Sequence, residues 1–92
     1  MSYRIEHAGR DTKPFSDYKF RILNGDQLVA RWSHDYRGDE HFIEFLDGST
    51  ESYPVGTVMD FVQGGGPRPL VLTARGVAYL DQKLSKGAAG EG

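Results

Sequence analysis

Hydrophobic and polar residues alternate along much of the N-terminal half of the chain. Tyr18, Phe20 and Ile22 alternate with Lys19 and Arg21. Because successive side chains of a strand point to opposite faces, this run predicts a strand with one apolar face. Less regular runs of the same kind occupy residues 3–7, 28–34, 41–46 and 49–53. Together they predict an antiparallel meander of four or five strands.

The segment 28–46 organises this meander, because it contains two alternating strands on either side of a polar turn at residues 35–40. One register gathers the apolar residues on a single face and also places Arg31 opposite Glu44, a favourable cross-strand pair. The other pairs in that register are His34 with His41, Trp32 with Ile43, Ala30 with Phe45 and Val29 with Leu46.

The turns on either side of this hairpin are predicted from the requirement that the apolar residues of neighbouring strands share one face. A bulged or three-residue turn at residues 24–26 would keep the apolar residues of both flanking strands on the core face. Its pairs would be Ile22 with Leu28, Phe20 with Ala30 and Tyr18 with Trp32. Asp47-Gly48 predicts a two-residue turn into the next strand, which ends at Pro54.

Two helices are expected after the meander. Thr57 and Asp60 have the spacing of a capping box, which predicts one or two helical turns. Thr73 is expected to cap a longer helix that ends near Leu84 and covers the sheet. Gly76 costs about 1 kcal/mol relative to alanine inside a helix, so it indicates close packing or a later helix start. Residues 64–69 are expected to form a loop, and residues 70–72 are expected to form either an added strand or a packed connector.

The expected architecture is therefore a single compact α+β domain over residues 1–84, with an antiparallel meander, a C-terminal helix packed on one face and one short helix. Residues 85–92 lack an apolar period and are expected to be a disordered tail. The expected core consists of Tyr18, Phe20, Ile22, Leu28, Ala30, Trp32, Ile43, Phe45, Val77, Leu80 and Leu84.

Composition narrows the function classes. The chain has 92 residues, a formal net charge of −2 and no cysteine. The charge argues against a broad basic surface for phosphate backbones, and the lack of cysteine removes disulfides and thiolate chemistry. No apolar run approaches the roughly 20 residues that cross a bilayer, and the first residues are charged. We expect a soluble cytoplasmic protein with no membrane partner.

His34 and His41 are the most evident candidates for metal or acid–base chemistry, because the hairpin register places them directly opposite each other. Imidazoles near Asp35, Asp39 and Glu40 could hold a divalent ion, but their spacing matches no established metal motif. No nucleophile motif accompanies them. We therefore assign no catalytic residue, metal ligand or cofactor, and a small metal-dependent enzyme is the third hypothesis.

Two other local patterns do not assign a function. Residues 64–70 are rich in glycine, yet they lack the lysine and the spacing of a phosphate-binding loop. The segment Leu72-Thr73-Ala74-Arg75-Gly76 resembles the start of the last helix in many winged-helix transcription regulators. That family has two or three helices before a short wing, whereas the corresponding part of this chain is predicted to form strands.

The outer face of the predicted sheet, opposite the C-terminal helix, is more apolar than solvent exposure requires. We therefore expect a non-catalytic interaction or adaptor domain that binds a protein partner or a second copy of itself. Its predicted partner-binding residues are Val29, Arg31, Phe42 and Leu46, with Tyr36 and Arg37 of the turn. The alternative hypothesis is a nucleic-acid-binding module that uses Lys19, Arg21, Arg31 and Arg37.

The core assignment leads to a first prediction. Replacing Trp32 by alanine should lower the free energy of unfolding by about 3–5 kcal/mol, because it removes the largest side chain assigned to the core. Such a loss is a large part of the stability of a small domain. Thermal or denaturant unfolding of Trp32→Ala measures it, and wild-type stability in this variant would contradict the core assignment.

Overall fold

A computed structural model describes residues 3–10 and 17–89 of the protein. It contains a five-stranded antiparallel sheet, a short helix, a two-stranded sheet and a C-terminal helix, which confirms the α+β meander. The large sheet has the order β1 (Tyr3–Arg10), β2 (Tyr18–Asn24), β3 (Gln27–His34), β4 (His41–Phe45), β5 (Thr50–Ser52). The remaining elements are α1 (Val58–Phe61), β6 (Val62–Gly65), β7 (Arg68–Leu72) and α2 (Ala74–Ala89).

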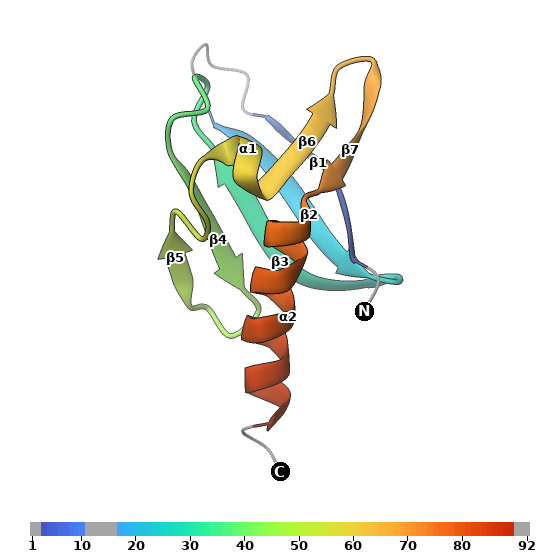
Figure 1. Ribbon diagram of the computed structural model, residues 1–92, viewed down its shortest axis with the longest axis vertical. Helices are drawn as coiled ribbons and strands as arrows, with labels where there is room; N and C mark the ends of the chain where they lie inside the picture. Colours follow the sequence, from blue (N-terminus) through green and yellow to red (C-terminus); the bar gives the residue numbers. More distant parts are fainter. Residues whose placement is uncertain (1–2, 11–16, 90–92) are drawn as a thin grey trace.

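The elements after β5 lie on one side of the large sheet (Figure 1). The core fills the space between these layers, and its fully buried members include Trp32, Ile43, Phe61 and Leu80. On the opposite side, which we call the outer face, none of the described helices or strands lies over the sheet (Figure 1).

The register of the β3–β4 hairpin is confirmed for the pairs that both strands contain. His34 lies opposite His41, Trp32 opposite Ile43, Ala30 opposite Phe45 and Arg31 opposite Glu44. The expected pair of Val29 with Leu46 does not form, because β4 ends at Phe45 and Leu46 begins the following turn.

The register expected between β2 and β3 is wrong by two residues. Gly25 and Asp26 form the turn, and Phe20 pairs with Trp32 while Ile22 pairs with Ala30. A bulge after Ile22 leaves Val29 without its own partner. Gly25 adopts a φ of +64°, a conformation that glycine accepts readily, and the bulge restores the apolar face that a tight turn would otherwise divide.

The turn between β4 and β5 also differs from the expected two-residue connection. Leu46-Asp47-Gly48 form a three-residue loop, in which the amide of Phe45 donates to Ser49 O at 2.9 Å. Phe42 therefore lies opposite Ser52 instead of Tyr53, and Ile43 lies opposite Glu51. Because a shift of one residue exchanges the two faces of a strand, Glu51 points to the side of the sheet that α2 covers.

Residues 64–69 are not a loop between the helices, and residues 70–72 form part of a strand, which is one of the two expected alternatives. They belong to the β6–β7 hairpin, in which Gly65 pairs with Arg68. Gly64 has a φ of +92°, and a Cβ placed on it would lie 2.0 Å from Pro69 O, so only glycine allows this close approach. The first strand is also longer than expected, since a bulge between His7 and Gly9 lets β1 continue to Arg10.

Several core residues differ from the expected set. Leu28 and Val77 are outside the buried cluster, whereas Ile5, Val62 and Tyr79 belong to it, as does Phe61. Tyr18, Phe45 and Leu84 pack against the cluster but are only partly buried. Helix α2 continues to Ala89 and so includes residues 85–89, which we expected to be a disordered tail, and residues 90–92 lie outside the described residues.

The start of α2 is as expected, because Thr73 Oγ1 accepts a hydrogen bond from the amide of Gly76 at 3.0 Å. Gly76 is buried against α1, and a Cβ on it would lie 2.6 Å from the carbonyl oxygen of Phe61. The close packing indicated by this glycine is therefore present at the junction of the two helices.

This junction gives a second prediction. Glycine-to-alanine changes usually stabilise a helix interior by about 1 kcal/mol. Gly76→Ala should instead destabilise the protein by about 1–3 kcal/mol, because the added methyl group forces α1 and α2 apart. Denaturant unfolding measures the effect. Ser85→Ala, at an exposed position of α2, is the control, and its stability should change by no more than about 0.5 kcal/mol. A Gly76→Ala protein more stable than wild type would contradict the packing.

Candidate functional site

The six predicted partner-binding residues lie in three places. Arg31 and Phe42 lie on the outer face, where they line one depression of the surface. Val29 and Leu46 line a different groove at the end of the sheet. Tyr36 and Arg37 lie in the β3–β4 turn and line neither.

The outer-face depression has a volume of about 570 Å³ and is formed by β1, β2, β3 and β4 with Asp17. Ser33, a small and buried residue that lines the depression, lies between Lys19 on β2 and Phe42 on β4. Phe42 remains 42% exposed at the side of the depression. The depression thus contains a small side chain between longer ones.

The charges around the outer-face depression are only partly balanced. Arg21 donates from Nε to Glu6 Oε1 at 3.0 Å and from Nη2 to the carbonyl of His7 at 3.3 Å. Arg31 lies between Arg21 and Glu44 in the sheet register and forms no ion pair with another described residue. Arg31 and Glu44 therefore lie opposite each other as expected, but their side chains form no ion pair.

The fourth predicted nucleic-acid residue is separate from the other three. Lys19, Arg21 and Arg31 line the outer-face depression, whereas Arg37 lies in the turn. There Arg37 Nε is 3.8 Å from Asp35 and 3.5 Å from Asp39, and its guanidinium lies 5.4 Å from the centre of the Tyr36 ring. Its charge is thus offset locally.

His41 is part of the core instead of an exposed turn. It is fully buried, and Trp32 Nε1 donates to its Nδ1 at 3.1 Å. Since an indole N–H can only donate, Nδ1 must be unprotonated, and Nε2 carries the hydrogen that it directs to Gly56 O at 3.3 Å. Both ring nitrogens are therefore occupied, which leaves His41 no free nitrogen for a metal ion.

His34 has a different role from His41, although the two face each other across the hairpin as expected. Its Nδ1 lies 2.6 Å from the carbonyl of Asp35, and its ring stacks on Tyr18 with centroids 5.1 Å apart. Among the described residues, no group of three or more His, Cys, Asp or Glu side chains is arranged to hold a metal ion.

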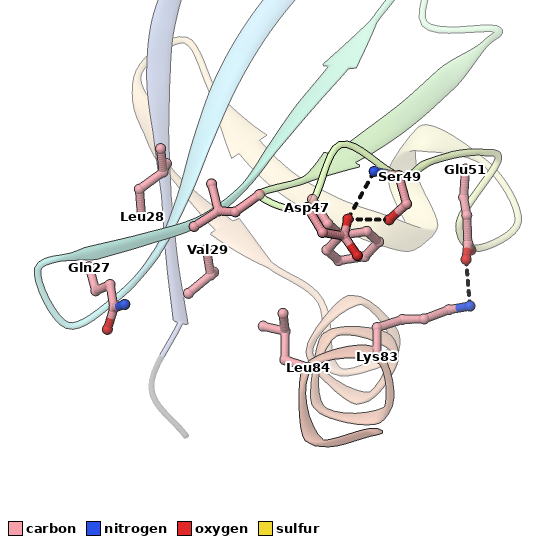
Figure 2. A pocket seen from close by; sticks show the side chains of 10 residues that line it. Gln27, Leu28, Val29, Asp47, Ser49, Glu51, Lys83 and Leu84 are labelled. Atoms are coloured by element: carbon pink, nitrogen blue, oxygen red, sulfur yellow. Dashed lines mark hydrogen bonds and ion pairs between the residues drawn. The ribbon is translucent and has the colours of Figure 1, made fainter. Parts of the chain in front are cut away.

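The second candidate surface, which we call the end groove, lies between β3, the β4–β5 turn and α2 (Figure 2). It has a volume of about 310 Å³. Val29 and Leu84 approach it from opposite sides, while Lys83 extends towards Glu51 at one end (Figure 2). Its lining residues are Gln27, Leu28, Val29, Phe45, Leu46, Asp47, Ser49, Glu51, Lys83 and Leu84.

The end groove depends on the two departures from the expected register. Val29 faces it because of the β3 bulge and packs partly against the core. Glu51 faces it because the β4–β5 turn has three residues. Sequence patterns alone missed Glu51 and Lys83, since the expected register placed Glu51 on the outer face.

The Glu51 carboxylate connects the sheet to α2. It accepts hydrogen bonds from Lys83 Nζ and from the Tyr79 hydroxyl, the latter at 2.7 Å. The hydrogen bond from Lys83, followed by that from Tyr79, lowers the pKa of Glu51 below its usual value of 4.5. Burial, together with the hydrogen bond to Glu51, raises the pKa of Tyr79 well above 10.0.

This network gives a third prediction, for pH dependence. Because the folded pKa of Glu51 lies below its unfolded value, the stabilisation is present above pH 4.5 and is lost as the pH falls through the folded pKa. Glu51→Gln should therefore cost about 0.5–1 kcal/mol at pH 7, a small value because the ion pair is partly exposed. The difference from wild type should shrink below pH 4.5.

Denaturant unfolding at a series of pH values measures this difference. Glu44→Gln serves as the control, because the Glu44 side chain makes no hydrogen bond or ion pair with another described residue and its loss should change stability less. A Glu51→Gln deficit that stays constant from acidic to neutral pH would contradict the role of the network.

Comparisons with known proteins do not assign a family. Searches against protein-family models, curated proteins and solved structures found no match for this chain. None of the helices in residues 3–10 and 17–89 has the length and apolar character needed to cross a membrane.

Proposed function

We propose that this protein is a non-catalytic interaction domain that binds a protein partner through the outer-face depression. One observation carries the proposal: an exposed phenylalanine and an arginine without an ion-pair partner among the described residues line the same concavity, on a sheet face that no described element covers. Aromatic and arginine side chains are enriched among the residues that dominate the binding energy of protein interfaces.

The chemistry of the depression suggests what the partner presents. Phe42 offers apolar surface that a partner's apolar side chain can cover. Arg31 offers a planar guanidinium, which binds a carboxylate through two parallel hydrogen bonds. A surface with an apolar residue beside an aspartate or glutamate therefore fits best.

A second copy of the chain meets these requirements. The depression contains Arg31 and also Glu44, which lie on neighbouring strands. In a two-fold dimer the same surface meets itself, so Arg31 of one copy can face Glu44 of the other while the two Phe42 rings share the centre. We therefore propose self-association as the first form of this interaction to test.

A nucleic acid is the alternative partner. Lys19, Arg21 and Arg31 line the same depression as Phe42, a combination that can neutralise phosphates and stack a base. Asp17 and Glu44 line it too, and Arg21 is already paired with Glu6. These carboxylates make the surface better suited to a protein than to a polyanion.

The fourth prediction separates these partners. Light scattering should give the mass of a dimer for the wild type and of a monomer for Phe42→Glu, because a buried carboxylate at the interface centre is costly. Met59→Glu is the matched control: Met59 is 65% exposed on α1, on the other side of the sheet, so this variant should remain dimeric.

Titration with a labelled single-stranded oligonucleotide tests the alternative. Binding that weakens steeply with salt and is lost in Arg31→Glu would favour the nucleic-acid function. A monomeric wild type with no oligonucleotide affinity would contradict both self-association and nucleic-acid binding.

A further inference from the structure

We propose that the end groove is a binding site for a compact amphipathic ligand with an apolar body and one protonated amine. The groove and the outer-face depression share no lining residue, so this inference is independent of the proposed function. Either site can be tested while the other is left intact.

The apolar part of the end groove comes from three separate elements. Val29 and Leu28 belong to β3, Phe45 and Leu46 to β4 and its turn, and Leu84 to α2. Leu46 is 59% exposed, although it adjoins these other apolar side chains. The volume of about 310 Å³ is at the lower end of the range for small-molecule sites, which are mostly apolar with a few polar groups.

The polar end of the groove determines which head group fits. Lys83 already contacts Glu51, so its ammonium is neutralised within the protein. Asp47 Oδ1 accepts hydrogen bonds from the amide of Ser49 at 2.8 Å and from Ser49 Oγ at 2.6 Å, and these bonds lower the pKa of Asp47. The Asp47 carboxylate therefore stays ionised at neutral pH.

The charge balance follows from these contacts. The lining contains two carboxylates, Asp47 and Glu51, and one cation, Lys83, so one negative charge is unmatched. An ammonium group can approach Asp47 while the apolar body lies between Val29 and Leu84 (Figure 2). A ligand carboxylate in the same position would be repelled by Asp47.

Three probes of similar size compare a cationic, a neutral and an anionic head group: 4-phenylbutylamine, 4-phenylbutan-1-ol and 4-phenylbutanoate. Methyl resonances of Val29 and Leu84, observed by NMR during titration, report binding in the groove. We expect the amine to bind best and the carboxylate worst, with about a three- to tenfold difference between their dissociation constants, since the charged contact is partly exposed to solvent.

Two variants test the separate parts of the site. Asp47→Asn can retain the hydrogen bonds from Ser49 through its carbonyl oxygen, and it should reduce the preference for the amine over the alcohol to less than about twofold. Leu46→Ser should weaken all three probes by about three- to tenfold, because it removes an apolar wall. Met59→Ser, an exposed apolar position away from the groove, should leave binding unchanged.

Three results would overturn the proposal. The first is that no probe shifts the Val29 or Leu84 methyl resonances at millimolar concentration. The second is that the carboxylate binds as well as the amine. The third is that these resonances shift with protein concentration alone and stop doing so in Leu46→Ser, which would assign the groove to a second copy of the chain.

Discussion

The contact between Trp32 and Phe61 holds the layers of this protein together. The two rings are stacked with centroids 5.1 Å apart, and both side chains are fully buried. Trp32 also packs against Phe20 on the neighbouring strand and donates a hydrogen bond to His41. Phe61 in turn meets α2, because its carbonyl accepts from the amide of Thr73 and lies against Gly76. One aromatic pair therefore links β3 to α1 and, through α1, to α2.

The positions of the surface side chains depend on small irregularities of the sheet. The bulge in β3 brings Val29 to the side that α2 covers, and the three-residue turn after β4 does the same for Glu51. Without these two irregularities, the end groove would lack one apolar wall and the carboxylate that binds Lys83. Bulges often change the direction of side chains near binding sites. Here a bulge and a three-residue turn together form a groove at the end of the sheet.

The two candidate surfaces use different physical properties. The outer-face depression is broad and mixes an exposed aromatic ring with charges of both signs, which suits another macromolecule. The end groove is smaller and mostly apolar, with charged groups at one end, which suits a small ligand. The histidines, which stood out in the sequence, contribute to neither surface, since His41 is committed to hydrogen bonds inside the core.

Features that depend on local patterns could be predicted from the sequence. The α+β architecture, the pairing of Trp32 with Ile43, the capping box at Thr57 and the start of α2 at Thr73 all follow from alternation, charge or spacing over a few residues. Turn lengths were harder to predict, because the local sequence is compatible with more than one length. A connection that is one residue longer exchanges the two faces of the next strand. The sheet faces on which Val29 and Glu51 lie could therefore be identified only from the structure.

Roles that depend on partners distant in the chain could be identified only from the folded protein. Gly64 lies in a strand where Pro69 of the neighbouring strand approaches it closely, and Gly65 pairs with Arg68, contacts that no local pattern reports. His41 became a core residue because Trp32 and Gly56 satisfy both of its ring nitrogens. A polar side chain can be buried when its hydrogen bonds are met, and whether they are met is a property of the folded chain.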